Sequence, residues 1–125
     1  MVGNYACRAL KTAILLLLFT FIAASDPAKA VFLVATPIGV KPILNYERDS
    51  SFSGFDFDWN NINKKAKHFL VFQSDDDPYV CLGNGEHLAK NLNVALNFVP
   101  NAGHFNKRAG YTKFDLLLEK LKPIL

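Results

Sequence analysis

The alternation of short apolar runs with amphipathic segments constrains the fold more than any other feature of this sequence. Three runs rich in β-branched and aromatic residues have the continuous hydrophobicity of strands buried on both faces of a sheet; they span residues 31–35, 68–73 and 94–99. Three segments with apolar side chains at helical spacing alternate with these runs: 59–66, 85–92 and 114–121. The alternation predicts parallel βαβ units, and therefore an α/β fold with a parallel β-sheet and flanking helices.

Composition and charge limit the class of protein. The chain has 125 residues, of which 50% are hydrophobic and 20% charged, so we expect one globular domain with a single core. The net charge is only +3. Positively charged side chains cluster only at Lys64, Lys65 and Lys67. We interpret this cluster as the solvent-facing side of a short helix capped by Asp58. We therefore expect no nucleic-acid partner.

The first part of the chain is dominated by an uncharged apolar run at residues 12–24. As a helix this run is roughly 20 Å long, short of the roughly 30 Å hydrocarbon core of a membrane. Arg8 and Lys11 before the run, and Ala28-Lys29-Ala30 after it, fit a signal peptide with a cleavage site. A helix buried on all sides inside a larger α/β protein has the same composition, so both interpretations stay open.

We accordingly divide the chain into an apolar helical segment, residues 1–29, and a main portion, residues 30–125. If the first segment is a buried helix, we expect a cytoplasmic protein. If it is a signal, residues 8–24 make the protein secreted or membrane-associated.

Acidic and basic side chains follow two neighbouring predicted strands. Asp75, Asp76 and Asp77 come after the run that ends at residue 73, and His104 comes after the run that ends at residue 99. Because the carboxyl ends of parallel strands meet at one edge of the sheet, we expect these two loops to lie side by side. A carboxylate there can accept the Nδ1–H of His104, fix its tautomer and stabilise the imidazolium formed during acyl transfer.

Among the three aspartates, Asp77 is our candidate for this contact. Pro78 follows it and restricts the turn that aims the carboxylate. Gly103, directly before His104, permits a backbone turn that a larger residue would resist. We interpret Asp75 and Asp76 as solvated loop charges, able to cap backbone N–H groups, rather than as metal ligands, because their spacing matches no metal-binding loop.

The remaining reactive side chains have simpler interpretations. Cys7 and Cys81 form no metal or disulfide pattern, so we expect two free thiols. The serines are not set in a nucleophile elbow and are not expected to be nucleophiles; those considered are Ser50, Ser51, Ser53 and Ser74. We expect no metal and no cofactor.

From Ala30 to the end, the sequence resembles the C-terminal half of an α/β-hydrolase. More narrowly, it is similar to the small serine hydrolases grouped with bacterial YdeN and retinoblastoma-binding protein nine. The residues that carry the resemblance are 31–35, Phe57-Asp58-Trp59 with Ile62, Lys65-Ala66-Lys67, residues 74–80, Gly85-Glu86 with Leu88-Ala89, Gly103-His104-Phe105-Asn106 and Gly110-Tyr111. The resemblance implies the C-terminal portion of a doubly wound α/β-hydrolase fold, with Asp77 as triad acid and His104 as triad base. It also implies a small-molecule substrate with an ester or amide-like acyl bond.

The sequence departs from that family at the nucleophile. The family has a Gly-x-Ser-x-Gly elbow before the first of these strands, and this sequence contains no such motif. Met1-Val2-Gly3-Asn4 has the character of the tail of an elbow, with Met1 where the serine would stand. Cys81 also replaces a proline that is common in the family.

Three hypotheses therefore remain. The first is a truncated serine hydrolase that is inactive alone because its serine lies upstream. The second is a secreted or membrane-anchored, non-catalytic binding module on a hydrolase scaffold. The third is a half-enzyme completed by a separate chain. In the first and third, an exposed sheet edge is available for a homodimer or a complementing chain.

Overall fold

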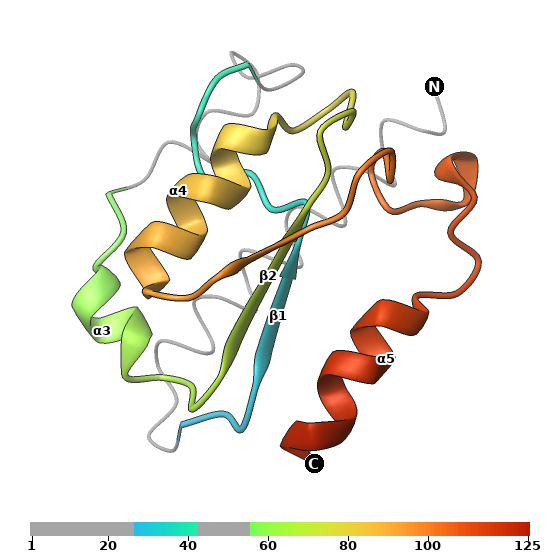
Figure 1. Ribbon diagram of the computed structural model, residues 1–125. Coiled ribbons are helices and arrows are strands. Elements are labelled where there is room, and N and C mark those ends of the chain that lie inside the picture. Colours follow the sequence, from blue (N-terminus) through green and yellow to red (C-terminus); the bar gives the residue numbers. More distant parts are fainter. Residues whose placement is uncertain (1–26, 43–55) are drawn as a thin grey trace, which may run out of the picture.

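The computed structural model describes residues 27–42 and 56–125. These residues contain a three-stranded parallel sheet in the order β1-β2-β3 (Figure 1). The strands are β1 (Val31–Val34), β2 (Phe69–Gln73) and β3 (Leu96–Phe98). The predicted α/β fold with a parallel sheet is therefore confirmed. The apolar run at residues 12–24 and the serines at 50–53 lie outside the described residues.

The central strand β2 is paired along its length with β1 and near its end with β3. Val31 to Val34 of β1 stand opposite Phe69 to Phe72, whereas β3 meets only the last three residues of β2. This explains why β3 is shorter than the predicted run at 94–99. It also explains the burial of the end of β2, where Val71, Phe72 and Gln73 are 1%, 0% and 0% exposed.

Helices cover both faces of the sheet. The helices α3 (Trp59–Asn63) and α4 (Leu82–Leu92) lie on one side, and α5 (Asp115–Leu121) lies on the other (Figure 1). Successive side chains of a strand point to opposite faces, so Val71 and Phe72 serve different layers. Val71 belongs to the cluster with α3 and α4, whereas the Phe72 ring packs edge-on against Phe114 at a centroid distance of 5.3 Å.

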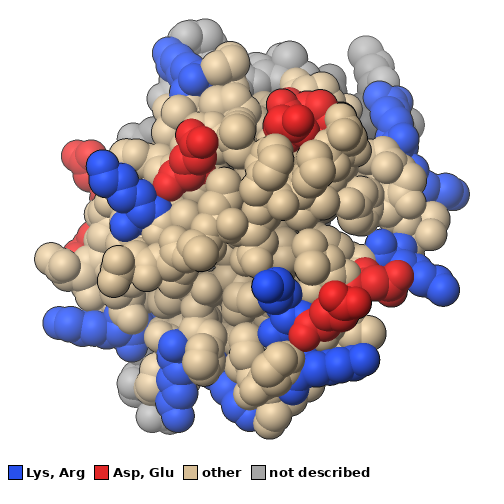
Figure 2. Space-filling view, in the orientation of Figure 1, with Lys and Arg blue, Asp and Glu red and all other residues tan. Residues whose placement is uncertain are grey.

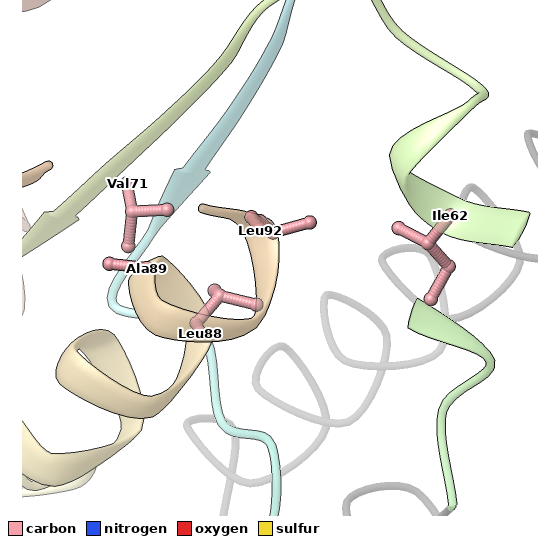
Figure 3. Close-up of a cluster of buried hydrophobic side chains, with 5 residues drawn as sticks. All are labelled: Ile62, Val71, Leu88, Ala89 and Leu92. Carbon is pink, nitrogen blue, oxygen red and sulfur yellow. The ribbon is translucent and has the colours of Figure 1, made fainter. Parts of the chain in front are cut away.

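The main hydrophobic cluster lies between β2, α3 and α4 (Figure 3). Leu88, Ala89 and Leu92 repeat on one face of α4 and are all at most 4% exposed. They close over Val71, and Ile62 of α3 completes the cluster. Burying a leucine, isoleucine or valine side chain stabilises a fold by roughly 1.5–3 kcal/mol. This cluster therefore contributes much of the stability of the domain.

Two helices differ from their predicted bounds by three residues, and α5 begins one residue later than predicted, at Asp115. The predicted helix at 59–66 ends at Asn63, because Ala66 instead forms a parallel bridge with Ala28. The predicted start of α4 at residue 85 is also wrong, since α4 begins at Leu82 with Cys81 as its N-cap. The N-cap predicted for α3 is confirmed: Asp58 Oδ1 accepts a hydrogen bond from Asn61 N at 3.0 Å.

The first turn of α4 lies very close to the end of β2. A Cβ atom on Gly85 would stand 2.5 Å from the Cβ of Gln73, so only glycine permits this approach. The contact places Gln73, and the loop that follows it, at a fixed distance from α4.

Among the described residues, no helix is long and apolar enough to cross a membrane.

Candidate active site

The sheet brings two loops together at the carboxyl ends of β2 and β3. We call residues 74–80 the acid loop and residues 100–105 the His loop. Nδ1 of His104 lies 2.8 Å from Oδ2 of Asp77. The predicted contact between these two residues is therefore present, and it results directly from the parallel pairing of the two strands.

The carboxylate of Asp77 is held from all sides. Its side chain is 0% exposed. Oδ1 accepts hydrogen bonds from the backbone N–H groups of Tyr79 at 2.8 Å and Val80 at 3.0 Å. Oδ2 accepts from His104 and, at a longer 3.4 Å, from Nε2 of Gln73. Because both oxygens are engaged, the carboxylate cannot rotate away from the imidazole, and the turn containing Pro78 keeps it in place.

His104 is half-buried, with 26% of its side chain exposed. The ring of Tyr79 contacts it edge-on at a centroid distance of 5.0 Å. With the carboxylate as acceptor at Nδ1, the neutral ring carries its proton on Nδ1 and leaves a lone pair on Nε2. Since Nε2 lies on the other side of the ring from Asp77, this nitrogen is the one that can exchange a proton with a substrate or nucleophile.

The other residues of the acid loop bind the backbone of the His loop. Asp75 Oδ1 accepts from Asn101 N at 2.8 Å, and Asp76 Oδ1 accepts from Gly103 N at 2.7 Å. The prediction that these carboxylates can cap backbone N–H groups is confirmed. Ser74 is 0% exposed, and its hydroxyl donates to the carbonyl oxygen of Gly103.

The backbone of the His loop is tightly constrained around His104. Gly103 has φ +55, and a Cβ there would lie 2.8 Å from the Cβ of Ala109, so glycine is required, as the sequence predicts. Phe105 also has a positive φ of +50, which is uncommon for a residue with a side chain. Its ring contacts Tyr111 and Phe114, both at 5.3 Å, and this aromatic packing holds the turn.

Two polar side chains that the sequence interpretation did not single out support the site. Gln73 is fully buried, and its Nε2 donates to Val80 O at 3.0 Å, which joins the two ends of the acid loop. Its Oε1 is buried with no hydrogen-bond partner. Asn84 is also fully buried; its Oδ1 accepts from Ile38 N at 2.9 Å and Val40 N at 3.1 Å. Asn84 thereby ties the loop after β1 to the start of α4, beside the acid loop.

The other candidates remain outside this arrangement. Cys81 is a free, half-buried thiol whose Sγ lies 3.5 Å from Val40 O. Trp59 is half-buried and packs against the hydrophobic cluster. In the part of the chain that the structure describes, no three His, Cys, Asp or Glu side chains gather as metal ligands would. Figure 2 shows Lys and Arg side chains spread around the visible face and interspersed with Asp and Glu.

Comparisons with known proteins agree with this architecture. A sequence model described as serine hydrolase matches residues 7–123. The crystal structure of the ydeN gene product from B. subtilis superimposes with a TM-score of 0.72 and 26% sequence identity. The match covers 80% of this chain and 53% of that protein, so the chain spans about half the length of its structural neighbour. Among curated proteins, none matches the sequence.

Proposed function

The chain belongs to the serine hydrolase family, and on this premise we propose that Asp77 and His104 are the acid and base of a triad that hydrolyses ester or amide-like acyl bonds. The observation that carries the proposal is the 2.8 Å contact between a fully buried carboxylate and Nδ1 of a half-exposed histidine. A structural histidine on a loop does not need a carboxylate that three other donors hold in place. A general base does, because its tautomer and orientation decide where the proton goes.

In the proposed reaction, His104 acts through Nε2. It removes the proton of a serine hydroxyl while the serine oxygen attacks the acyl carbon, and Asp77 stabilises the imidazolium that forms. The same proton then passes to the leaving alcohol or amine as the tetrahedral intermediate collapses to an acyl-enzyme. A water molecule, deprotonated by His104, releases the acid and regenerates the serine.

The proposal requires a serine from outside this sequence. The sequence contains no Gly-x-Ser-x-Gly motif. Ser74, the one serine among the described residues, is fully buried and donates its hydroxyl hydrogen to Gly103. We infer that the nucleophile comes from a preceding segment of a longer polypeptide or from a separate chain, and that this chain alone does not hydrolyse substrates. The greater length of the ydeN gene product supports this inference.

The sheet offers a place for such a complement. Within residues 27–42 and 56–125, β1 is an outer strand, paired with β2 on one side. An outer strand presents backbone donors and acceptors that another strand can use. We propose that a complementing chain, or a second copy of this chain, pairs at β1.

For localisation we propose the cytoplasm, with residues 8–24 belonging to the hydrolase domain rather than to a secretion signal. The family match supports this because it begins at residue 7 and includes the apolar run. Mass spectrometry of the mature N-terminus tests it. Cleavage near Ala24 or Ala30 would favour the secreted or membrane-anchored binding module instead.

The function is tested by restoring the nucleophile. The gene is extended to any in-frame upstream Gly-x-Ser, or the chain is mixed with a separately expressed N-terminal half, and a fluorophosphonate probe is added. We expect labelling of the supplied serine and none of this chain alone. The substitution His104→Ala should slow labelling on the order of 10³-fold or more while the protein stays folded. Undiminished labelling of His104→Ala would contradict the assignment.

A further inference from the structure

The acid loop is joined to the His loop by more than the catalytic pair. Each of the four consecutive residues 74–77 makes one side-chain hydrogen bond to the His loop. Only the last of these, from Asp77, reaches the imidazole. The other three reach backbone groups of Asn101 and Gly103, so they restrain the segment that leads to His104.

Two of these contacts converge on Gly103. Asp76 holds its N–H at 2.7 Å, and Ser74 donates to its C=O. The N–H belongs to the peptide group before Gly103, and the C=O belongs to the peptide group shared with His104. Both peptide planes around this glycine are therefore fixed, and the direction of the Cα–Cβ bond of His104 follows from them.

This restraint acts where the backbone would otherwise be free. Gly103 lacks a side chain and has a left-handed φ of +55, so its own conformational preferences are weak. Asp76 itself is exposed to solvent. An exposed carboxylate contributes little to stability through charge. Its defined contact with Gly103 is thus better explained by geometry than by stability.

We propose that Asp76, together with Ser74, is a positioning residue for His104. By fixing Gly103 from both sides, it keeps Nδ1 of the imidazole in line with Asp77 and so selects the tautomer with a free Nε2. The inference rests on the proposed role of His104 as base, but it concerns the geometry of the ring and is measurable without a nucleophile.

The test is the tautomer ratio of His104 in the full 125-residue chain. Long-range ¹H–¹⁵N spectra of histidine-labelled protein, at alkaline pH where histidine is neutral, report the ratio of Nδ1–H to Nε2–H forms. The wild type should show mainly Nδ1–H. The substitution Asp76→Ala should lower the ratio about fivefold, the effect of one net hydrogen bond. Asp76→Asn keeps an acceptor oxygen and should stay within about twofold of the wild type.

A matched control separates positioning from stability. Asp58 is another exposed aspartate that accepts one backbone N–H, from Asn61 at 3.0 Å, but at the start of α3. Asp58→Ala should lower the melting temperature and leave the tautomer ratio unchanged. Ser74→Ala removes the second contact to Gly103 and should lower the ratio, which supplies an independent variant should Asp76→Ala not fold.

The outcomes also separate this inference from the proposed function. An unchanged ratio in both Asp76→Ala and Ser74→Ala, with the preference lost in Asp77→Asn, overturns the positioning role and leaves the acid–base pair standing. A wild-type protein with no preference for Nδ1–H contradicts the pair itself.

Discussion

Strand β2 passes through two regions that are equally buried and are held together in different ways. Val71 and Gln73 point to the same face of the sheet and are 1% and 0% exposed. Val71 is packed by the leucines of α4, and many interchangeable contacts fix its surroundings. Gln73, two residues later, is fixed by side-chain hydrogen bonds to Val80 and, at a longer 3.4 Å, to Asp77, and by the close approach of Gly85.

The difference separates stability from function within one strand. In the apolar region, neighbouring side chains partly compensate for the loss of one contact. The main consequence of a substitution there is a lower free energy of unfolding. In the polar region, each hydrogen bond sets the position of a particular atom, so its loss displaces the acid loop or the His loop. Substitutions in the two regions should therefore move different measurements.

The largest effect on stability is expected in the apolar region. Leu88→Ala should lower the free energy of unfolding by about 2–5 kcal/mol, because it leaves a cavity in the cluster between α4 and β2. The tautomer ratio of His104 should stay within about twofold of the wild type below the melting transition, a tolerance well under the fivefold effect of one hydrogen bond. Urea denaturation and the ¹H–¹⁵N spectra measure the two quantities.

A second leucine provides the control for that substitution. Leu118 on α5 is 49% exposed, and Leu118→Ala should cost well under half as much. A change of the His104 tautomer in folded Leu88→Ala would break the distinction between the regions, since it would mean that core packing alone sets the imidazole.

An intermediate effect is expected where the regions meet. Gly85→Ala places a Cβ 2.5 Å from the Cβ of Gln73 and 3.3 Å from Cδ1 of Leu96, so α4 must shift. We expect a loss of about 1–3 kcal/mol, partly offset by the better helix propensity of alanine. Because Gln73 holds Val80 and contacts Asp77, the tautomer ratio should fall as well.

Gly83 is the matched control in the same turn of α4. Its added Cβ would lie 3.0 Å from Cγ1 of Val40, in the loop after β1, rather than against Gln73 of β2. Gly83→Ala should therefore leave the tautomer ratio unchanged. Equal ratios in both alanine variants would show that the approach of α4 to β2 does not position the acid loop.

The sequence predicts the apolar region better than the polar one for a physical reason. Hydrophobic periodicity is a local pattern, so the strands and the face of α4 that carries Leu88 and Leu92 could be located from it. The end of α3 could not, because Ala66 leaves the helix to pair with Ala28, a partner far away in the sequence. The start of α4 was hidden by glycines that are typical of loops.

At the site, topology sufficed for one contact and not for the others. The meeting of Asp77 and His104 follows from two adjacent parallel strands and needs no detailed coordinates. Whether Asp75 and Asp76 face solvent or cap the His loop depends on where single N–H groups point, which no local pattern specifies. The buried polar pair Gln73 and Ser74, directly continuing an apolar strand, was the available signal for a supporting network.

The smallest effect on stability is expected at Asp75. Its substitution tests whether the contact to Gly103 differs in its effect from a contact farther from His104. Asp75 makes the same kind of bond as Asp76, but to Asn101, two residues farther from His104 than the N–H of Gly103. Asp75→Ala should cost about 0.5–1 kcal/mol of stability, since an exposed hydrogen bond is lost. The His104 tautomer should stay within about twofold of the wild type, because the two contacts to Gly103 remain, and thermal melting with the same spectra measures both. If Asp75→Ala instead lowers the ratio as much as Asp76→Ala does, the loops are coupled as one rigid unit and Gly103 has no special part in it.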